Sequence, residues 1–181
     1  GAEHLYALTA VMTGTEPHKT LKLPGGIRAE RSYRFLTLTT RPAAAPPAFS
    51  YQFASLPAQA LIPEIGQRIH FTLVPGCRGA VPDRRPSVAC LDAGKAVMPL
   101  TIRSVRPGDA MHPLGMEGRK KVQDIFTDAK VPRAERKRIP LFWFGDELAW
   151  IGGMRISQCL RVTGKTRTVL RIEMVPHGGS G

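Results

Sequence analysis

Two segments of this sequence alternate apolar and polar residues with a period of two, which is the pattern of a strand with one buried face. The sequence RIHFTLV at residues 68–74 places Ile69, Phe71 and Leu73 on one face. The sequence TVLRIEMV at residues 168–175 does the same with three apolar side chains, Leu170, Ile172 and Met174. A chain built around such segments must pair them in a sheet and cover one face of that sheet.

Shorter apolar segments separated by glycine and proline predict further strands. They lie at residues 20–40 (with a tight turn at Pro24–Gly26), 87–91, 100–102, 141–144, 148–151 and 154–162. The proline-rich segments 41–48 and 75–86 are predicted to be a linker and a loop, because proline cannot donate a backbone hydrogen bond to a central strand.

One amphipathic helix is predicted over Lys120–Ala129. Its apolar side chains fall at positions i, i+3, i+4 and i+7 and form a single stripe, namely Val122, Ile125, Phe126 and Ala129. A second short helix is expected to open at Pro132, run through Arg138 and close before Pro140.

Many short strands around few helices indicate the α+β class. We expect a mostly antiparallel, β-sandwich-like C-terminal domain with one or two short helices, preceded by a smaller β-rich segment. The expected parts are the end of a helical linker at 1–18, with a helix over Glu3–Met12, a β-rich intermediate segment at 19–97, the C-terminal domain at 98–176 and a disordered tail at 177–181. A chain that starts inside a helix is expected to be a fragment of a longer protein.

The charge of the chain favours a nucleic acid or another anionic partner. Its 26 Lys and Arg against 14 Asp and Glu give a formal net charge of +12 and a pI near 10.4. The charge is concentrated in Arg119–Arg138, where eight basic and three acidic residues leave a net charge of +5. This basic stretch belongs to the segment 102–140, which also contains the clearest helix and is therefore expected to be ordered.

No catalytic or metal-binding pattern is found in the sequence. Residues 164–166 (GKT) resemble the end of a phosphate-binding loop, but Cys159 stands where that loop needs glycine, so a turn is predicted. The three cysteines are far apart without a CxxC pair, and the five histidines have no cysteine or carboxylate at ligand spacing. Asp109 follows a glycine and is predicted to be a backbone acceptor in a turn, and Asp146–Glu147 to be the tip of a hairpin.

The remaining chemistry is anion binding. Residues 115–118 (GMEG) lead into the predicted helix at Lys120. Because backbone N–H groups and the helix dipole favour a phosphate at a helix N-terminus, a phosphate site is expected there, with a solvated basic face as the alternative.

Several motifs carry a resemblance to a known family. They include RPGD at 106–109, PLGM at 113–116, KKVQD at 120–124, FTDAKVP at 126–132, PL at 140–141, WI at 150–151 and RVT at 161–163. Together they resemble the C-terminal domain of bacterial tRNA(Ile)-lysidine synthases, and KLPGG at 22–26 and LDA at 91–93 resemble the region that precedes that domain.

The resemblance implies a parent enzyme that uses ATP, with Mg²⁺, to join lysine to the wobble cytidine of tRNA(Ile). The catalytic domain of that family carries a Ser-Gly-Gly-x-Asp-Ser loop of the PP-loop ATPases, which this sequence lacks. We therefore expect no ligase activity and no bound cofactor from this chain alone. Its implied role is tRNA recognition at the acceptor stem, in the cytoplasm and without a membrane segment.

Basic side chains of the segment 102–140, together with Arg155, are the candidates for contacts to the tRNA backbone. The candidates are Arg103, Arg106, Arg119, Lys120, Lys121, Lys130, Arg133, Arg136 and Arg155, with Lys137 and Arg138 as weaker ones.

A different class of function stays open at this point. The aromatic residues Phe142, Trp143, Phe144 and Trp150 could serve a protein–protein interface as well as a core. In that case the chain would be a self-association module, such as a homodimer, with an incidental basic face.

Overall fold

The computed structural model describes residues 9, 18–23, 27–32, 35–39, 47–76 and 85–177. They belong to two units, residues 1–44 and residues 45–181. In the first unit, β1 (His18–Lys22), β2 (Arg28–Ser32) and β3 (Phe35–Thr39) form a three-stranded antiparallel sheet. The strands expected within residues 20–40 are thus confirmed. The helix expected over Glu3–Met12 lies outside the described residues, apart from Thr9, which is helical.

In the second unit, one sheet is built on the two alternating segments. β14 (Thr168–Pro176) pairs with β6 (Gln67–Pro75) and with β7 (Val88–Asp92), and β5 (Gln59–Ile62) pairs with β6, all antiparallel. The apolar faces of β14 and β6 are buried as predicted, except that Leu73 is 55% exposed. Its neighbours Val74 and Val169 are only half-buried, so this end of the pair is incompletely covered.

The second sheet has five strands in the order β13-β12-β11-β8-β4. Its members are β4 (Ser50–Phe53), β8 (Leu100–Arg103), β11 (Leu141–Phe144), β12 (Glu147–Ile151) and β13 (Arg155–Ile156). Every residue of β12 after Glu147 is buried, so both faces of this sheet are covered. On one face, the rings of Phe142 and Trp150 stack with their centroids 4.7 Å apart.

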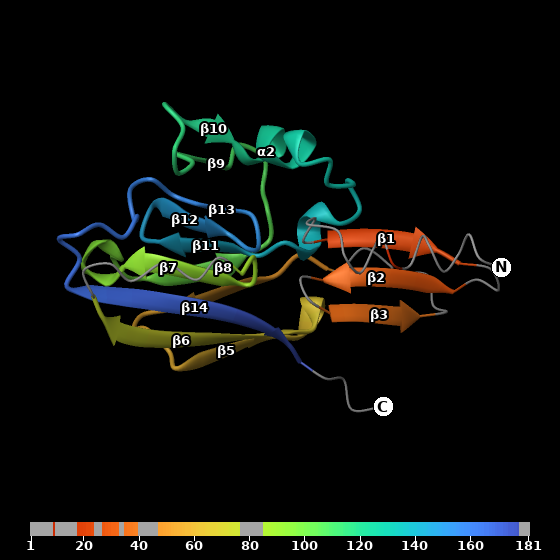
Figure 1. Ribbon diagram of the computed structural model, residues 1–181, viewed down its shortest axis with the longest axis horizontal. Coiled ribbons are helices and arrows are strands. Elements are labelled where there is room, and N and C mark those ends of the chain that lie inside the picture. The colour runs from red at the N-terminus through yellow and green to blue at the C-terminus, as the bar shows by residue number, and fades with distance from the viewer. Residues whose placement is uncertain are drawn as a thin grey trace. The chain divides into compact units, whose positions relative to one another are not determined.

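A third layer covers the other face of the five-stranded sheet (Figure 1). It contains α2 (Val122–Asp128) and the short ribbon of β9 (Ala110–Met111) and β10 (Lys120–Lys121). Val122, Ile125 and Phe126 from α2 form a buried cluster with Met111, Ile139, Leu141, Leu148 and Ile151. The α+β, mostly antiparallel, sandwich-like architecture is therefore as predicted. No helix among the described residues is long and apolar enough to cross a membrane.

Three element boundaries differ from the prediction because strand pairing competes with local pattern. Lys120 and Lys121 pair with Met111 and Ala110 instead of opening the helix, and Ala129 is exposed beyond its end. The strand expected at 154–162 is reduced to β13, because the following residues pair with the segment after β9. The second helix is a single 3-10 turn, η4 (Arg136–Arg138). The other 3-10 turns among the described residues are η2 (Pro63–Ile65) and η3 (Ala93–Lys95).

The predicted boundary at residue 97 does not separate two units. The division lies between Ala44 and Ala45. β4 hydrogen-bonds to β8 and β7 hydrogen-bonds to β14, so strands from both sides of residue 97 share each sheet. Strands this far apart in sequence carry no local signal of their pairing.

Candidate nucleic-acid interface

Arg103, one of the predicted contacts, is mostly buried and is bonded within the protein. Its Nη1 and Nη2 donate to the two carboxylate oxygens of Asp109 at 2.8 and 2.7 Å. The guanidinium also lies 4.6 Å from the ring centroid of Trp143. With only 11% of its side chain exposed, Arg103 has little surface to offer a nucleic acid.

Asp109 holds the turn between β8 and β9. Its side chain accepts from the backbone N–H of Arg106 at 2.7 Å, which confirms the predicted turn acceptor. Its own carbonyl accepts from the N–H of Val122, the first residue of α2, at 2.8 Å. One residue therefore fixes the RPGD turn, the Arg103 guanidinium and the start of the helix.

Two more predicted contacts are engaged with α2. Lys120 forms an ion pair with Asp128. Arg136 donates to the carbonyl of Val131, to Gln123 and to Thr127, and its guanidinium lies 5.8 Å from the ring centroid of Phe126. These contacts fasten the segment after the helix back onto its outer side.

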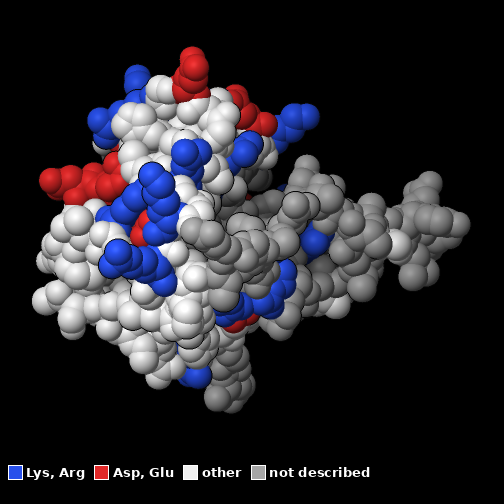
Figure 2. Space-filling model, turned by 60° about the vertical axis from the view of Figure 1, so that its left-hand side comes forward, with Lys and Arg blue, Asp and Glu red and all other residues white. Residues whose placement is uncertain are grey.

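The other six predicted contacts are exposed, and their side chains have no hydrogen bond or ion pair within the described part of the chain. They are Arg106, Arg119, Lys121, Lys130, Arg133 and Arg155. The exposed face of α2 itself carries Gln123, Asp124, Thr127 and Asp128, so the free cations lie before and after the helix rather than along it. Figure 2 shows acidic side chains among the basic ones on the face that it presents.

Lys130 adopts a backbone conformation that lysine normally avoids. Its φ of 53° is the only positive φ of a non-glycine residue in the described ranges. The N–H of Val131 bonds to the carbonyl of Phe126 at 2.8 Å, which is the helix ending that usually carries glycine at this position. A lysine here costs about 1 kcal/mol relative to glycine, and strain of this kind is often kept for a functional side chain.

The structure does not join residues 115–118 directly to the helix N-terminus, where the phosphate site was expected. Residues 115–118 are separated from α2 by Arg119 and β10, and the first N–H of the helix already donates to Asp109. The helix has only 7 residues, which limits its dipole. The loop is exposed, and the N–H of Gly115 donates to Gln158 at 3.2 Å.

Two hollows lie on either side of Met154 and Arg155. The larger, of about 250 Å³, is bounded by Arg85, Cys90 and Leu114, and the smaller, of about 160 Å³, by Met116, Lys120 and Asp128. Arg155 borders both hollows, and its side chain is exposed.

Comparison with known proteins agrees with this architecture. Residues 100–174 match the TilS substrate C-terminal domain. The tRNA(Ile)-lysidine synthase of Symbiobacterium thermophilum is 35% identical over 174 residues, which cover 92% of this chain and 36% of that protein. The enzyme of the same name from Geobacter sulfurreducens is 35% identical over 169 residues, covering 92% and 35%. A crystal structure of a TilS C-terminal domain superposes with a TM-score of 0.58 at 27% identity, over 72% of this chain and all of that one.

Residues 100–174 form a TilS substrate C-terminal domain. The chain as a whole is similar to the C-terminal region of the tRNA(Ile)-lysidine synthases, called the TilS region below. It spans about 36% of the length of the first of these relatives. Within this TilS region, the aromatic residues considered for an interface are mostly core: Phe142, Phe144 and Trp150 are no more than 2% exposed. Trp143 is half-buried beneath Arg103. The self-association hypothesis thus loses the residues on which it depended.

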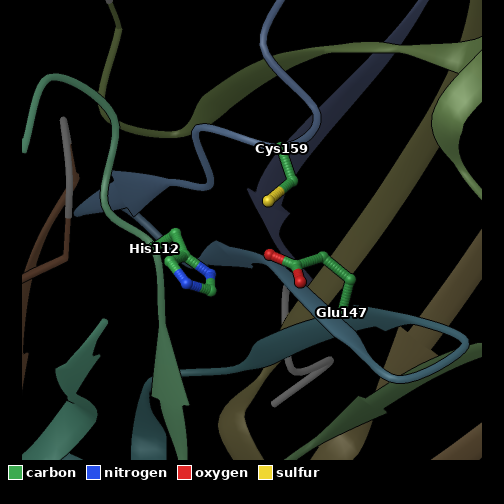
Figure 3. A group of neighbouring side chains, drawn as sticks. All are labelled: His112, Glu147 and Cys159. Atoms are coloured by element: carbon green, nitrogen blue, oxygen red, sulfur yellow. The ribbon is translucent and has the colours of Figure 1, made fainter. Parts of the chain in front are cut away.

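The TilS region also contains a side-chain group that sequence reasoning missed. The side chains of His112, Glu147 and Cys159 come together, with their ligand atoms all within 4.8 Å of one another (Figure 3). The spacings of 35 and 12 residues match no metal-binding motif, so only the pairing of the segments after β9 and β13 could reveal the group. The GKT segment, by contrast, forms the predicted turn, with Thr166 donating to Asp92 at 2.8 Å.

Proposed function

We propose that this chain binds tRNA for a tRNA(Ile)-lysidine synthase, holding tRNA(Ile) by its acceptor stem in the cytoplasm. The observation that carries the proposal is a set of six exposed cations whose side chains have no partner among the described residues, in a region whose relatives bear that enzyme's name. In the parent enzyme, the ligation of lysine to the wobble cytidine with ATP and Mg²⁺ is assigned to the part of the relatives that this chain does not span.

The distribution of the cations suits a nucleic-acid stem. Double-stranded RNA is recognised mainly through its shape, its phosphates and its 2′-hydroxyls. Arg119 and Lys121 precede α2 and Lys130 and Arg133 follow it, so a backbone would be held across both ends of the helix. Arg103, Lys120 and Arg136 are assigned to the scaffold that presents these side chains.

Titration of the chain with tRNA(Ile) at several salt concentrations tests the proposal. Each phosphate contact contributes roughly 0.7 to 0.9 to the slope of log K against log salt concentration. Arg119→Ala combined with Lys121→Ala should therefore reduce the slope by about 1.5 and weaken binding by about tenfold to thirtyfold. Lys95→Ala combined with Lys165→Ala removes the same charge from exposed positions outside residues 102–140 and is the matched control.

Equal slopes for the two double variants would refute the assigned surface. An acceptor-stem minihelix and an anticodon stem-loop, titrated in parallel, test the part of tRNA that is bound. Preference for the anticodon stem-loop would contradict the acceptor-stem assignment while leaving tRNA binding intact. If light scattering shows a dimer that binds neither RNA, the self-association alternative is favoured.

A further inference from the structure

The three grouped side chains come from three different segments of the fold. His112 follows β9, Glu147 opens β12, and Cys159 lies in the turn after β13. In Figure 3 the imidazole, the carboxylate and the thiol face a common space. His112 and Glu147 are half-buried and Cys159 is exposed, so this space is open to solvent on the cysteine side.

Hydrogen bonds tie the three segments together. The hydroxyl of Ser157, which is 0% exposed, donates to Glu147 Oε1 at 2.6 Å and accepts from the N–H of Cys159 at 3.1 Å. The N–H of Gln158 donates to the carbonyl of His112 at 2.7 Å. Ser157 thus orients both the carboxylate and the cysteine backbone, as the supporting residues of metal sites commonly do.

We propose that His112, Glu147 and Cys159 bind one divalent transition-metal ion of the Zn²⁺ type. Imidazole nitrogen, thiolate sulfur and carboxylate oxygen are the three donor types that Zn²⁺ takes in proteins, and three protein ligands leave a fourth position for water. The thiolate selects against Mg²⁺ and Ca²⁺, which prefer oxygen ligands alone.

The geometry requires only a small closure. Tetrahedral bonds of the usual Zn–N, Zn–O and Zn–S lengths set the ligand atoms roughly 3.5 Å apart. The atoms of the group lie within 4.8 Å of one another, so they approach by roughly 1 Å at most when the ion binds. Rotation of the exposed Cys159 side chain supplies most of this movement. The ion would then join the end of β9, the start of β12 and the turn after β13.

Metal titration of the full chain tests the site. Zn²⁺, in competition with a chromogenic chelator, should bind with one equivalent of high affinity, and Co²⁺ should give a thiolate-to-cobalt charge-transfer band. Cys159→Ser should abolish the charge-transfer band, because it removes the thiolate. His112→Gln should weaken Zn²⁺ binding by about 100-fold. Glu147→Gln should also weaken Zn²⁺ binding, although the amide oxygen of the new side chain still accepts the hydrogen bond from Ser157. Ser157→Ala should weaken it by about tenfold to 100-fold.

Cys90→Ser is the matched control, because Cys90 is a half-buried free cysteine outside the group. Circular dichroism of each variant without metal confirms that it is folded. The proposal is overturned if the chain binds no stoichiometric Zn²⁺, if Cys159→Ser binds it unchanged, if Cys90→Ser loses it equally, or if Mg²⁺ competes at similar concentration. Since none of the three ligands is a proposed tRNA contact, tRNA titration reports separately on the proposed function.

Discussion

The ion pair of Arg103 and Asp109 should be a main structural support of the α2 layer rather than part of the RNA surface. The side chains are 11% and 8% exposed, and two N–H···O bonds of 2.7 and 2.8 Å join them. Asp109 also accepts from the N–H of Arg106, and Trp143 lies beside the guanidinium. Removing either partner leaves a nearly buried charge without its counter-charge.

The expected cost follows from this burial. Truncating one partner of a buried, hydrogen-bonded ion pair destabilises a protein by about 3–5 kcal/mol. Asp109→Ala and Arg103→Ala should each lower the free energy of unfolding by about that amount, which corresponds to roughly 10–15 °C in Tm for a unit of this size. The double variant should lose less unfolding free energy than the two single variants lose together, and the difference, the coupling energy, should be about 2–3 kcal/mol.

Urea unfolding of the wild type, the two single variants and the double variant measures the coupling. Arg103→Gln adds the test of function, because it removes the charge that a phosphate contact would require. It should lower stability by about 3–5 kcal/mol, as Arg103→Ala does, and leave the tRNA salt slope unchanged at a temperature where the variant is folded. The structural assignment would be refuted if each single variant lost less than about 1 kcal/mol of stability and the two losses simply added in the double variant. A tRNA salt slope lowered by about 0.8 would refute it as well.

Three further variants separate stability from binding or test the packing. Lys130→Gly relieves the strain of the positive φ and should raise stability by about 1 kcal/mol while weakening tRNA binding. If stability and tRNA affinity rose together or fell together, Lys130 would not be a tRNA contact held in a strained conformation. Phe126→Ala removes a ring that is 0% exposed and should cost about 3–5 kcal/mol in urea unfolding, so a loss below 1 kcal/mol would rule out its central place in the core. Burial, then the hydrogen bond to Glu64 and its charge, raise the pKa of Tyr51 above 10.0. The stability that Tyr51 contributes should therefore be complete below about pH 10 and fall as the pH rises through its raised pKa, and Tyr51→Phe should flatten this decline.

The strands and core were largely predictable because their signal is local. The alternation in 168–175 and 68–74 locates β14 and β6, and the stripe of Val122, Ile125 and Phe126 locates α2. Which strands pair was not predictable, since β4 and β8 are joined over about fifty residues of sequence. The same limit explains the misplaced helix start, because the pairing of Lys120 and Lys121 with β9 is a tertiary contact.

The positive charge of the candidate interface was predictable from the sequence, but which of its cations lack a partner within the protein was not. All nine predicted cations count equally in the sequence, whereas three of them have partners that only the fold supplies: Asp109 for Arg103, Asp128 for Lys120, and Gln123 with Thr127 for Arg136. Two of these partners, Asp109 and Asp128, are acids of the segment 102–140. An acid in a basic segment therefore both lowers the local charge and engages one of the cations.

The proposed tRNA surface and the metal-ligand group differ in their chemistry. The proposed tRNA contacts are strong bases that need no precise mutual geometry, so their density in the sequence predicts a basic surface but not which of its cations are available. His112, Glu147 and Cys159 each carry little signal in sequence, and only the buried Ser157 and the pairing after β13 bring them together. A substitution at Ser157 should consequently disturb the metal-ligand group without altering the salt dependence of tRNA binding. That separation is expected because the hydroxyl of Ser157 bonds to Glu147 and Cys159, whereas the side chains of the proposed tRNA contacts make no hydrogen bond within the described part of the chain.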